Sequence, residues 1–239
     1  GLLARLDALM AHGVTTVEVK SGYGLSTDEE LRHLALIAEA DRRHPVRIVA
    51  TFLGAHAVPD EFRGRQAAYV DHVVHDMLPA VAAAFPRAFC DVFCDEGAFT
   101  LAETARILGA AAGLGLRGKV HSDEFANLGA TTLAAEMGCT SADHLVAAEP
   151  SDMDAMARAG TVAVLLPGTT VGLGSRRFAD ARAMIARGVP VALGSDHNPG
   201  TCPSENLPLM MALAARYCGL LPAEAVVAAT RNAAHAVGA

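Results

Sequence analysis

Three residues that could bind a cation each stand at the end of a short apolar run. Asp196 lies in VALGSDHNPG (residues 191–200), His121 follows LRGKV, and His144 closes CTSADH. A carboxylate that ends a hydrophobic segment costs several kcal/mol to bury unless a metal ion or a buried cation is its partner. Histidine nitrogens and carboxylate oxygens are common ligands of zinc and related ions. These residues therefore indicate a metal site, provided that the fold brings them together.

The chemistry that such a site supports is hydrolysis. A bound ion lowers the pKa of water, a carboxylate takes up the proton, and a histidine polarises the attacked carbonyl. Asp196 has two carboxylate oxygens and can serve as ligand and base together. A single histidine at a strand end is more often a hydrogen-bonded rim residue than a ligand. The repetition of polar residues after successive apolar runs is what favours the functional interpretation.

The elements that must position these residues alternate along the chain. Short apolar runs predict strands near 14–20, 46–53, 88–94, 116–121, 139–145, 161–166 and 189–194. Segments with helical spacing predict helices over 27–42, 66–85, 101–113, 127–137, 151–159, 176–187, 204–219 and 222–237. Thr27 and Glu30 have the spacing of a capping box at the start of the first of these helices. Alternation of strands and helices predicts a parallel sheet, whose strand ends share one edge.

The number of strands decides between two α/β architectures. Seven runs fit a doubly wound sheet, whereas a (β/α)8 barrel needs eight strands. The opening GLLARLDALMAHG resembles a helix that feeds the first run, which predicts a strand before residue 1. We therefore expect an incomplete (β/α)8 barrel with strands 2–8 present, forming one domain over residues 1–239 that is truncated at both ends.

Composition excludes several classes of protein. Of the 239 residues, 52% are hydrophobic and 19% charged, so a sizeable core is expected. The net charge of −7 and the absence of a Lys/Arg cluster speak against nucleic-acid binding. No apolar run approaches the length of a membrane span. The five cysteines are odd in number and form no Cys-x-x-Cys pair, which is typical of reduced thiols in the cytoplasm.

The polar strand ends belong to longer blocks with a family resemblance. The chain closely resembles imidazolonepropionase, of the amidohydrolase superfamily, along essentially its whole length. The blocks are VEVKSGYGL, TFLGAHAVP, DVFCDEGAF, KVHSDEFANLGA, SADHL, LLPG, SDHNPGT and ATRNAAHAVG. The resemblance implies hydrolysis of the ring C–N bond of 4-imidazolone-5-propanoate to N-formimidoyl-L-glutamate in histidine degradation. It also implies one zinc or iron ion (Zn²⁺ or Fe³⁺), a cytoplasmic enzyme and a homodimer at full length.

The same resemblance assigns roles to residues. It implies that His121 and Asp196 are metal ligands, and that His144 lies beside the metal and acts on the reacting carbonyl. Glu124 is expected to contact the imidazolone ring and to take part in catalysis with His144 and Asp196. The residues implied in substrate binding are Tyr23, His56, Glu124, Asn198, Gly200 and Thr201.

The sequence departs from the family pattern in three respects. The superfamily carries a His-x-His metal motif on barrel strand 1, and no His-x-His occurs in these residues. The family's arginine for the substrate carboxylate follows that motif, and the small β-sandwich built from both chain ends is missing as well. We therefore expect weak metal binding and little activity of the 239 residues alone. Two open sheet edges would also favour aggregation.

Two other functions remain open from the sequence. One is another amidohydrolase-superfamily enzyme, such as a guanine or cytosine deaminase, although KSGYG and AHAVP match the imidazolone enzyme better. The other is a truncated barrel without catalytic function. A dinucleotide-binding protein fits less well, because the glycine-rich stretch 168–174 lacks GxGxxG spacing.

Overall fold

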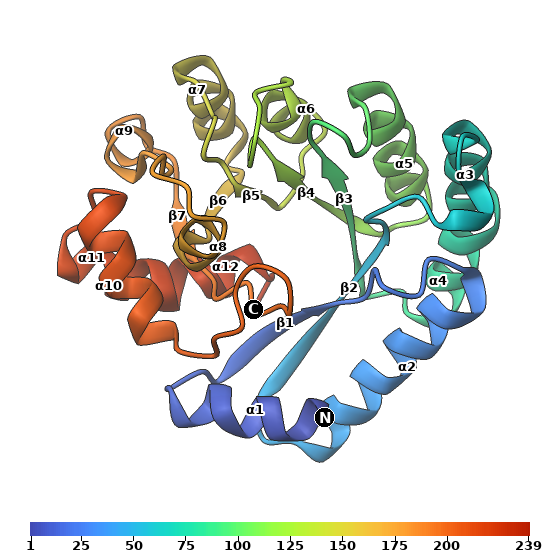
Figure 1. The fold of residues 1–239 in the computed structure, drawn as a ribbon, viewed down its shortest axis with the longest axis horizontal. Coiled ribbons are helices and arrows are strands. Elements are labelled where there is room, and N and C mark those ends of the chain that lie inside the picture. The colour runs from blue at the N-terminus through green and yellow to red at the C-terminus, as the bar shows by residue number, and fades with distance from the viewer.

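A curled sheet of seven parallel strands forms the centre of the computed structural model, which describes residues 1–239 (Figure 1). The strands pair in sequence order, each with the next, in parallel register. They are β1 (Thr16–Lys20), β2 (Arg47–Ala55), β3 (Phe89–Cys94), β4 (Arg117–Ser122), β5 (Ser141–His144), β6 (Val162–Leu165) and β7 (Val191–Leu193). All seven predicted strands are present, and their parallel order matches the expected incomplete (β/α)8 barrel.

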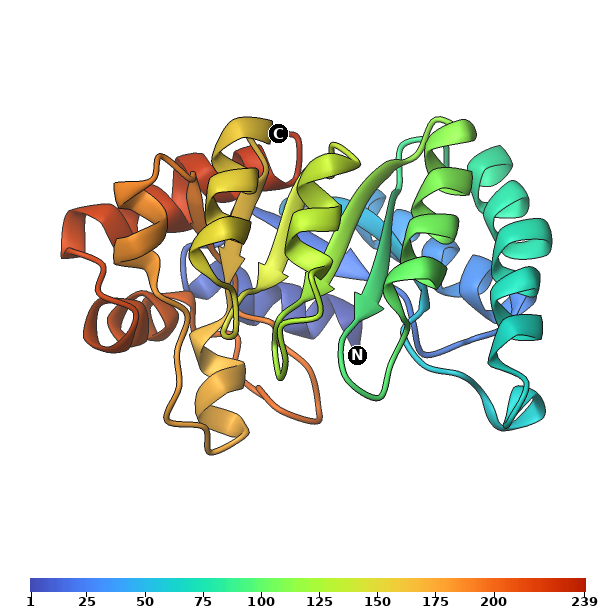
Figure 2. The same ribbon diagram turned by 90° about the horizontal axis from the view of Figure 1, so that it is seen from above.

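Helices cover the outer face of the sheet (Figures 1 and 2). The α-helices are α1 (Leu2–Ala11), α2 (Thr27–Arg43), α3 (Gln66–His72), α4 (Leu78–Ala84), α5 (Leu101–Gly113), α6 (Ala130–Glu136), α7 (Pro150–Ala159), α8 (Pro167–Gly172), α9 (Ala181–Ala186), α10 (Leu207–Tyr217), α11 (Pro222–Val227) and α12 (Ala233–Ala236). Short η segments are a 3₁₀ turn, η1 (Asp60–Phe62), and two π turns, η2 (Val73–Met77) and η3 (Ala228–Asn232). None of these helices is long and apolar enough to cross a membrane.

The helix predictions hold in place but not in every detail. The predicted helices over 66–85 and 222–237 are each interrupted by a π turn. The segment predicted as helix from residue 176 begins its helix only at Ala181. Helix α8 was not predicted, because Pro167-Gly168 has the composition of a turn; proline at the first helical position is compatible with a helix start.

The predicted capping box at the start of α2 is wrong. Ser26 is the N-cap, and its side chain accepts a hydrogen bond from the backbone N–H of Glu29. Thr27 lies inside the helix, and Glu30 is fully buried rather than turned back to a cap. The helix packs inward through Leu34 and Ile37, which are buried in the main core.

Both edges of the sheet lack a second partner strand. Strand β1 pairs only with β2, and β7 pairs only with β6, so the sheet curls without closing. All five residues of β1 are half-buried, whereas every residue of β7 is buried. The buried apolar side chains form one main cluster of 46 residues between the sheet and the helices. This packing fixes the strands and so fixes where their polar ends lie.

Candidate functional site

The polar residues predicted from the sequence lie at or just beyond the carboxyl ends of the strands. His121 is the penultimate residue of β4, and His144 is the final residue of β5. His56 follows β2 directly, and Asp196 follows β7 by three residues. Figure 2 shows that the strands point the same way and that their following loops extend beyond the same edge. Parallel α/β barrels carry their active sites at this edge.

His121 is held by a buried carboxylate. Its Nδ1 donates to Asp91, at 3.1 Å from Oδ1 and 3.0 Å from Oδ2. Asp91 lies on β3 and is fully buried. Burial opposes ionisation of Asp91, but the charges of His121 and Lys20 outweigh it and hold the pKa of Asp91 well below its usual range. The ring of His121 lies 5.3 Å from the ring of His144, centroid to centroid.

His144 and Glu124 form a second close pair. His144 Nε2 lies 3.7 Å from Glu124 Oε2. Burial, reinforced by the neighbouring His121, lowers the pKa of His144 to about 4, so its imidazole is neutral near pH 7. Burial raises the pKa of Glu124 to about 7, and the charge of Asp196 adds to this effect. Glu124 can therefore hold or release a proton near neutral pH, which is the property that general acid–base catalysis requires.

Asp196 lies near enough to Glu124 and His144 for its charge to affect their pKa values. Besides raising the pKa of Glu124, its charge raises the pKa of Tyr23, which is shifted first of all by burial. The Thr169 hydroxyl of α8 donates to Asp196 Oδ2. Asp196 and His144 both have positive φ, 47° and 80°, a conformation that costs energy for residues other than glycine. Such strain collects at functional sites, where the surrounding structure must hold it in place.

The polar groups of the loop after β7 form hydrogen bonds within the loop. Asn198 Oδ1 accepts hydrogen bonds from the backbone N–H groups of Gly200 and Thr201, at 2.9 and 2.8 Å. Its Nδ2 donates to the backbone carbonyl of Asp196 at 2.8 Å. In the structure these three predicted substrate contacts shape the loop that carries Asp196.

Tyr23 and His56 form an aromatic pair at another part of the rim. Their rings meet edge to face with centroids 5.4 Å apart. His56 Nδ1 donates to the backbone carbonyl of Gly22 at 2.8 Å, which leaves Nε2 as its free nitrogen. Tyr23 is 63% exposed, so its ring is accessible to a small molecule.

Two buried carboxylates, neither predicted to support the rim, hold the loops that carry Tyr23 and Glu124. Glu30 accepts the backbone N–H groups of Gly22, Gly24 and Leu25. Asp95 accepts those of residues 124, 125 and 126, at 2.7 to 3.0 Å. Both are almost inaccessible, with 0% and 2% exposure. A charged residue at a predicted helical position (Glu30) or strand end (Asp95) was the available signal.

An ion-pair network lies beneath the rim, inside the curled sheet. Lys20 Nζ contacts three carboxylates, Asp91 at 2.6 Å, Glu18 at 3.1 Å and Asp143 at 3.2 Å. Lys119, 1% exposed, contacts Glu18 at 2.8 Å. These carboxylates raise the pKa of Lys20 despite its burial, and the two lysines lower the pKa of Glu18 to about 2. The network is charged throughout the physiological pH range.

Two sets of residues offer ligand atoms for a cation. The ligand atoms of Asp91, His121 and Asp143 lie within 4.8 Å of one another. The set expected from the sequence consists of His121 and Asp196 at the rim. The two sets share His121, and they differ in whether a cation would lie beneath the rim or at it.

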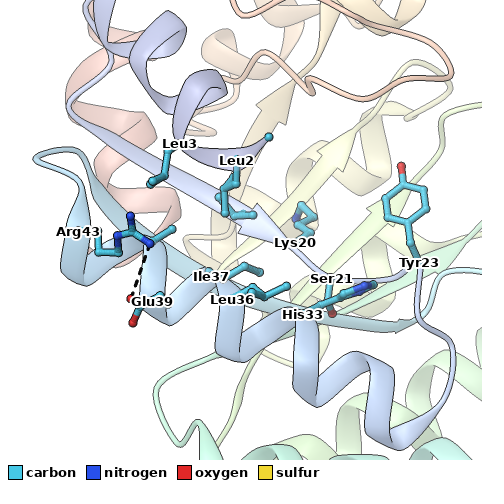
Figure 3. A pocket seen from close by; sticks show the side chains of 13 residues that line it. Leu2, Leu3, Lys20, Ser21, Tyr23, His33, Leu36, Ile37, Glu39 and Arg43 are labelled. Carbon is cyan, nitrogen blue, oxygen red and sulfur yellow. Dashed lines mark ion pairs between the residues drawn. The ribbon is translucent and has the colours of Figure 1, made fainter.

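A cavity of about 470 Å³, which neither His121 nor His144 lines, lies along the edge of β1 that has no partner strand. Figure 3 shows Leu2, Leu3, Leu36 and Ile37 around it, with Tyr23 standing at one end. Of the predicted site residues only Tyr23 lines this cavity. The cavity follows the open sheet edge and not the cluster of titratable groups.

The chain is similar to imidazolonepropionases along nearly all of its length. It is 54% identical to the enzyme of Symbiobacterium thermophilum over 99% of the chain and 56% of that protein. It is 52% identical to the enzyme of Chloroflexus aggregans over 99% of the chain and 57% of that protein. The identity to the Haloarcula marismortui enzyme is 50%, over 99% of the chain and 55% of that protein. The chain thus spans little more than half the length of these curated relatives, and no protein-family model matches it.

Solved structures of more distant sequence share the fold. An N-isopropylammelide isopropylaminohydrolase from Burkholderia multivorans superposes with a TM-score of 0.73 at 22% identity, over 99% of this chain and 63% of that one. A guanine deaminase from C. acetobutylicum with bound guanine superposes with a TM-score of 0.72 at 15% identity, over 98% and 61%. An adenosine deaminase from Xanthomonas campestris with bound zinc gives 0.70 at 18% identity, over 99% and 56%. At these identities the likeness establishes the barrel architecture alone.

Proposed function

This chain belongs to the imidazolonepropionase family, and on that premise we propose that its protein opens the ring of 4-imidazolone-5-propanoate. Water cleaves the cyclic amide C–N bond and gives N-formimidoyl-L-glutamate, a step of histidine degradation. The observation that carries the proposal is identity of 50 to 54% to enzymes of that name over 99% of the chain. Because the chain spans about half of those enzymes, the activity is proposed for the longer protein.

We propose one zinc or iron ion at the rim, with His121 and Asp196 among its ligands. The donor set fits such an ion: His121 has its Nδ1 on Asp91 and its Nε2 free, and Asp196 has one oxygen without a side-chain donor. The zinc bound in the Xanthomonas deaminase gives a precedent within the fold. A bound ion would supply Lewis acidity to water and carbonyl oxygen.

The chain's own residues then have separate tasks in the proposal. Neutral His144, protonated on one ring nitrogen, donates a hydrogen bond to the carbonyl oxygen as charge develops there. Glu124, 3.7 Å from His144 and with a pKa of about 7, holds the imidazolone ring and moves a proton to or from a ring nitrogen. Asp196 accepts the proton of the attacking water.

Substrate contacts come from the rest of the rim. The Tyr23 hydroxyl and the free Nε2 of His56 bind the substrate's polar groups. Asn198, Gly200 and Thr201 line the pocket through the loop that they shape around Asp196. The full-length protein is proposed to be a cytoplasmic homodimer with a small-molecule substrate, which rests on the family similarity alone.

The second candidate is deamination of an aromatic base. The superposition on guanine and adenosine deaminases favours it, but at 15 and 18% identity. The third candidate is a barrel without catalytic function.

A turnover assay separates these candidates. The full-length protein, loaded with zinc or iron, is incubated with 4-imidazolone-5-propanoate or with guanine, and products are followed by NMR. We expect the wild type to form N-formimidoyl-L-glutamate and Asp196→Asn to form none. The control is Glu96→Gln, which should turn over normally because Glu96, next to Asp95 in sequence, is exposed and its side chain makes no hydrogen bond. Product from guanine alone would establish the deaminase, and no product from either substrate would leave the non-catalytic barrel.

A further inference from the structure

The cluster of Asp91, His121 and Asp143 already contains a cation. The Lys20 ammonium lies 2.6 Å from Asp91 Oδ2 and 3.2 Å from Asp143 Oδ2, between the two carboxylates. Its third proton reaches Glu18 at 3.1 Å. An ammonium has three donors and no acceptor, so all its hydrogen bonds are made. A metal ion placed among these carboxylates would have to displace a half-buried, fully bonded lysine.

The two oxygens of Asp91 face different partners. Oδ2 accepts the short hydrogen bond from Lys20, and Oδ1 accepts the hydrogen bond from His121 Nδ1 at 3.1 Å, although Nδ1 also lies 3.0 Å from Oδ2. Asp91 is fully buried, so no water competes for either oxygen. An ionised carboxylate only accepts hydrogen bonds, so in the neutral imidazole of His121 the proton is on Nδ1. Its Nε2 then keeps its lone pair.

We propose that Asp91 is a positioning residue for His121, and that Lys20 makes it so. Lys20 holds Asp91 ionised and in place, and Asp91 fixes the ring orientation of His121 and the tautomer whose Nε2 can bind a metal at the rim. The Asp91–His121–Asp143 cluster is accordingly a support beneath the metal site and not a cation site itself. This inference rests on the metal role of His121 in the proposed function.

Asp91→Asn tests the inference because an amide has only one acceptor oxygen. The Lys20 ammonium claims that oxygen, since an ammonium cannot accept a hydrogen bond. The amide NH₂ group then faces His121 Nδ1, which must accept, and the proton moves to Nε2. The substitution is thus expected to reverse the tautomer and to remove the nitrogen lone pair that the metal needs.

Asp143→Asn is the matched control. Asp143 is also buried, also contacts Lys20 and belongs to the same cluster, but it makes no hydrogen bond to His121. Its other oxygen accepts from the Ser141 hydroxyl, which can rotate to accept from an amide instead. The two substitutions change the buried charge equally, so a difference between them reports the hydrogen bond to His121.

The experiment has two readouts in the full-length protein. Long-range ¹H–¹⁵N NMR of the metal-free protein gives the His121 tautomer, and competition with a chelating dye gives the affinity for zinc alone. We expect the Nδ1–H tautomer in the wild type and in Asp143→Asn, and the Nε2–H tautomer in Asp91→Asn. The dissociation constant for zinc should be about tenfold or more higher in Asp91→Asn than in Asp143→Asn, the range that lost support of a metal-ligating histidine typically costs.

Three results would overturn the inference. They are an Nε2–H tautomer in the wild type, an unchanged tautomer in Asp91→Asn, and equal weakening of zinc binding by both substitutions, which would make the cluster itself the cation site. If Asp91→Asn does not fold, the wild-type tautomer and the effect of Asp143→Asn on zinc affinity still decide. The NMR readout needs neither metal nor turnover, so a failure of the proposed function leaves it valid.

Discussion

Glu30 offers the sharpest test of how the rim is built. Its buried carboxylate accepts the backbone N–H groups of Gly22, Gly24 and Leu25, which flank or adjoin Tyr23. Oε1 takes Gly24 and Leu25 at 2.8 and 2.9 Å, and Oε2 takes Gly22 at 3.0 Å. Glu30→Gln keeps the shape of the side chain but replaces one oxygen by an NH₂ group. We expect this single change to loosen the loop that carries Tyr23.

The magnitude follows from those three bonds. The amide can keep its oxygen on Gly24 and Leu25, but its NH₂ group then meets the N–H of Gly22, which loses its shorter hydrogen bond (3.0 Å) and keeps only the longer one to Oε1 (3.2 Å). The remaining two bonds lose their charge assistance, which accounts for roughly half of their strength. At about 1.5 to 3 kcal/mol per bond to a charged group, one lost bond and two halved bonds should cost about 3 to 6 kcal/mol of unfolding free energy.

Glu29→Gln is the control on the same helix. Glu29 is half-exposed, and its side chain contacts only Arg32, at 3.1 Å. Such a surface ion pair contributes about 0 to 0.5 kcal/mol. Urea unfolding of both variants and of the wild type measures the difference. Equal stability of the two variants would refute the assignment of Glu30 as the support of the Tyr23 loop, and a raised KM in Glu30→Gln alone would extend it to substrate binding.

Three further predictions concern the rest of the rim. Asp95→Asn should cost about 3 kcal/mol in urea unfolding, because either orientation of the amide loses two of the four backbone hydrogen bonds that Asp95 accepts, at least one of them in the Glu124 loop; a cost below about 1 kcal/mol would contradict it. The raised pKa of Glu124 means that its contribution to stability is present below the unfolded value of 4.5 and is lost as pH rises through about 7. In metal-free protein Glu124→Gln should therefore reduce the fall in unfolding free energy between pH 5 and pH 8 by on the order of 1 to 2 kcal/mol, and parallel pH profiles of wild type and variant would speak against the shift. When the metal concentration is a hundredfold the dissociation constant, removal of the metal should lower the unfolding free energy of the wild type by about 2.7 kcal/mol and that of Asp196→Asn by much less. An equal drop in melting temperature for the two proteins would exclude Asp196 as a ligand.

The strands and their polar ends could be predicted because each rests on local pattern. Seven apolar runs with intervening helical spacing gave the sheet order, and parallel strands share one edge for their carboxyl ends. His121 and His144 consequently lie within 5.3 Å of each other, ring to ring, although 22 other residues separate them in sequence. Glu30 was assigned to a helix cap and Asp95 to no role, because nothing local distinguishes a buried carboxylate that binds backbone N–H groups of a loop from one at a helix start or in solvent.

The ion pairs beneath the rim show the same limit. Lys20 contacts Asp91 and Asp143, which lie 71 and 123 residues further along the chain. Only the curl of the sheet brings the side chains of β1, β3 and β5 together. Periodicity indicates which face of the sheet a residue occupies, but not which charged residue of another strand it contacts. The N-cap of α2 at Ser26, one residue before the prediction, reflects the uncertainty of helix ends in any reading of spacing.

The position of the metal ion tests the central claim most directly. Crystals of the full-length protein, grown with zinc and measured on both sides of the zinc absorption edge, locate the ion by its anomalous scattering. The account predicts one peak at the rim, within coordination distance of His121 Nε2 and the Asp196 carboxylate, with Lys20 still bound to Asp91. A peak between Asp91 and Asp143, or none near His121 in a protein that turns over its substrate, would contradict it.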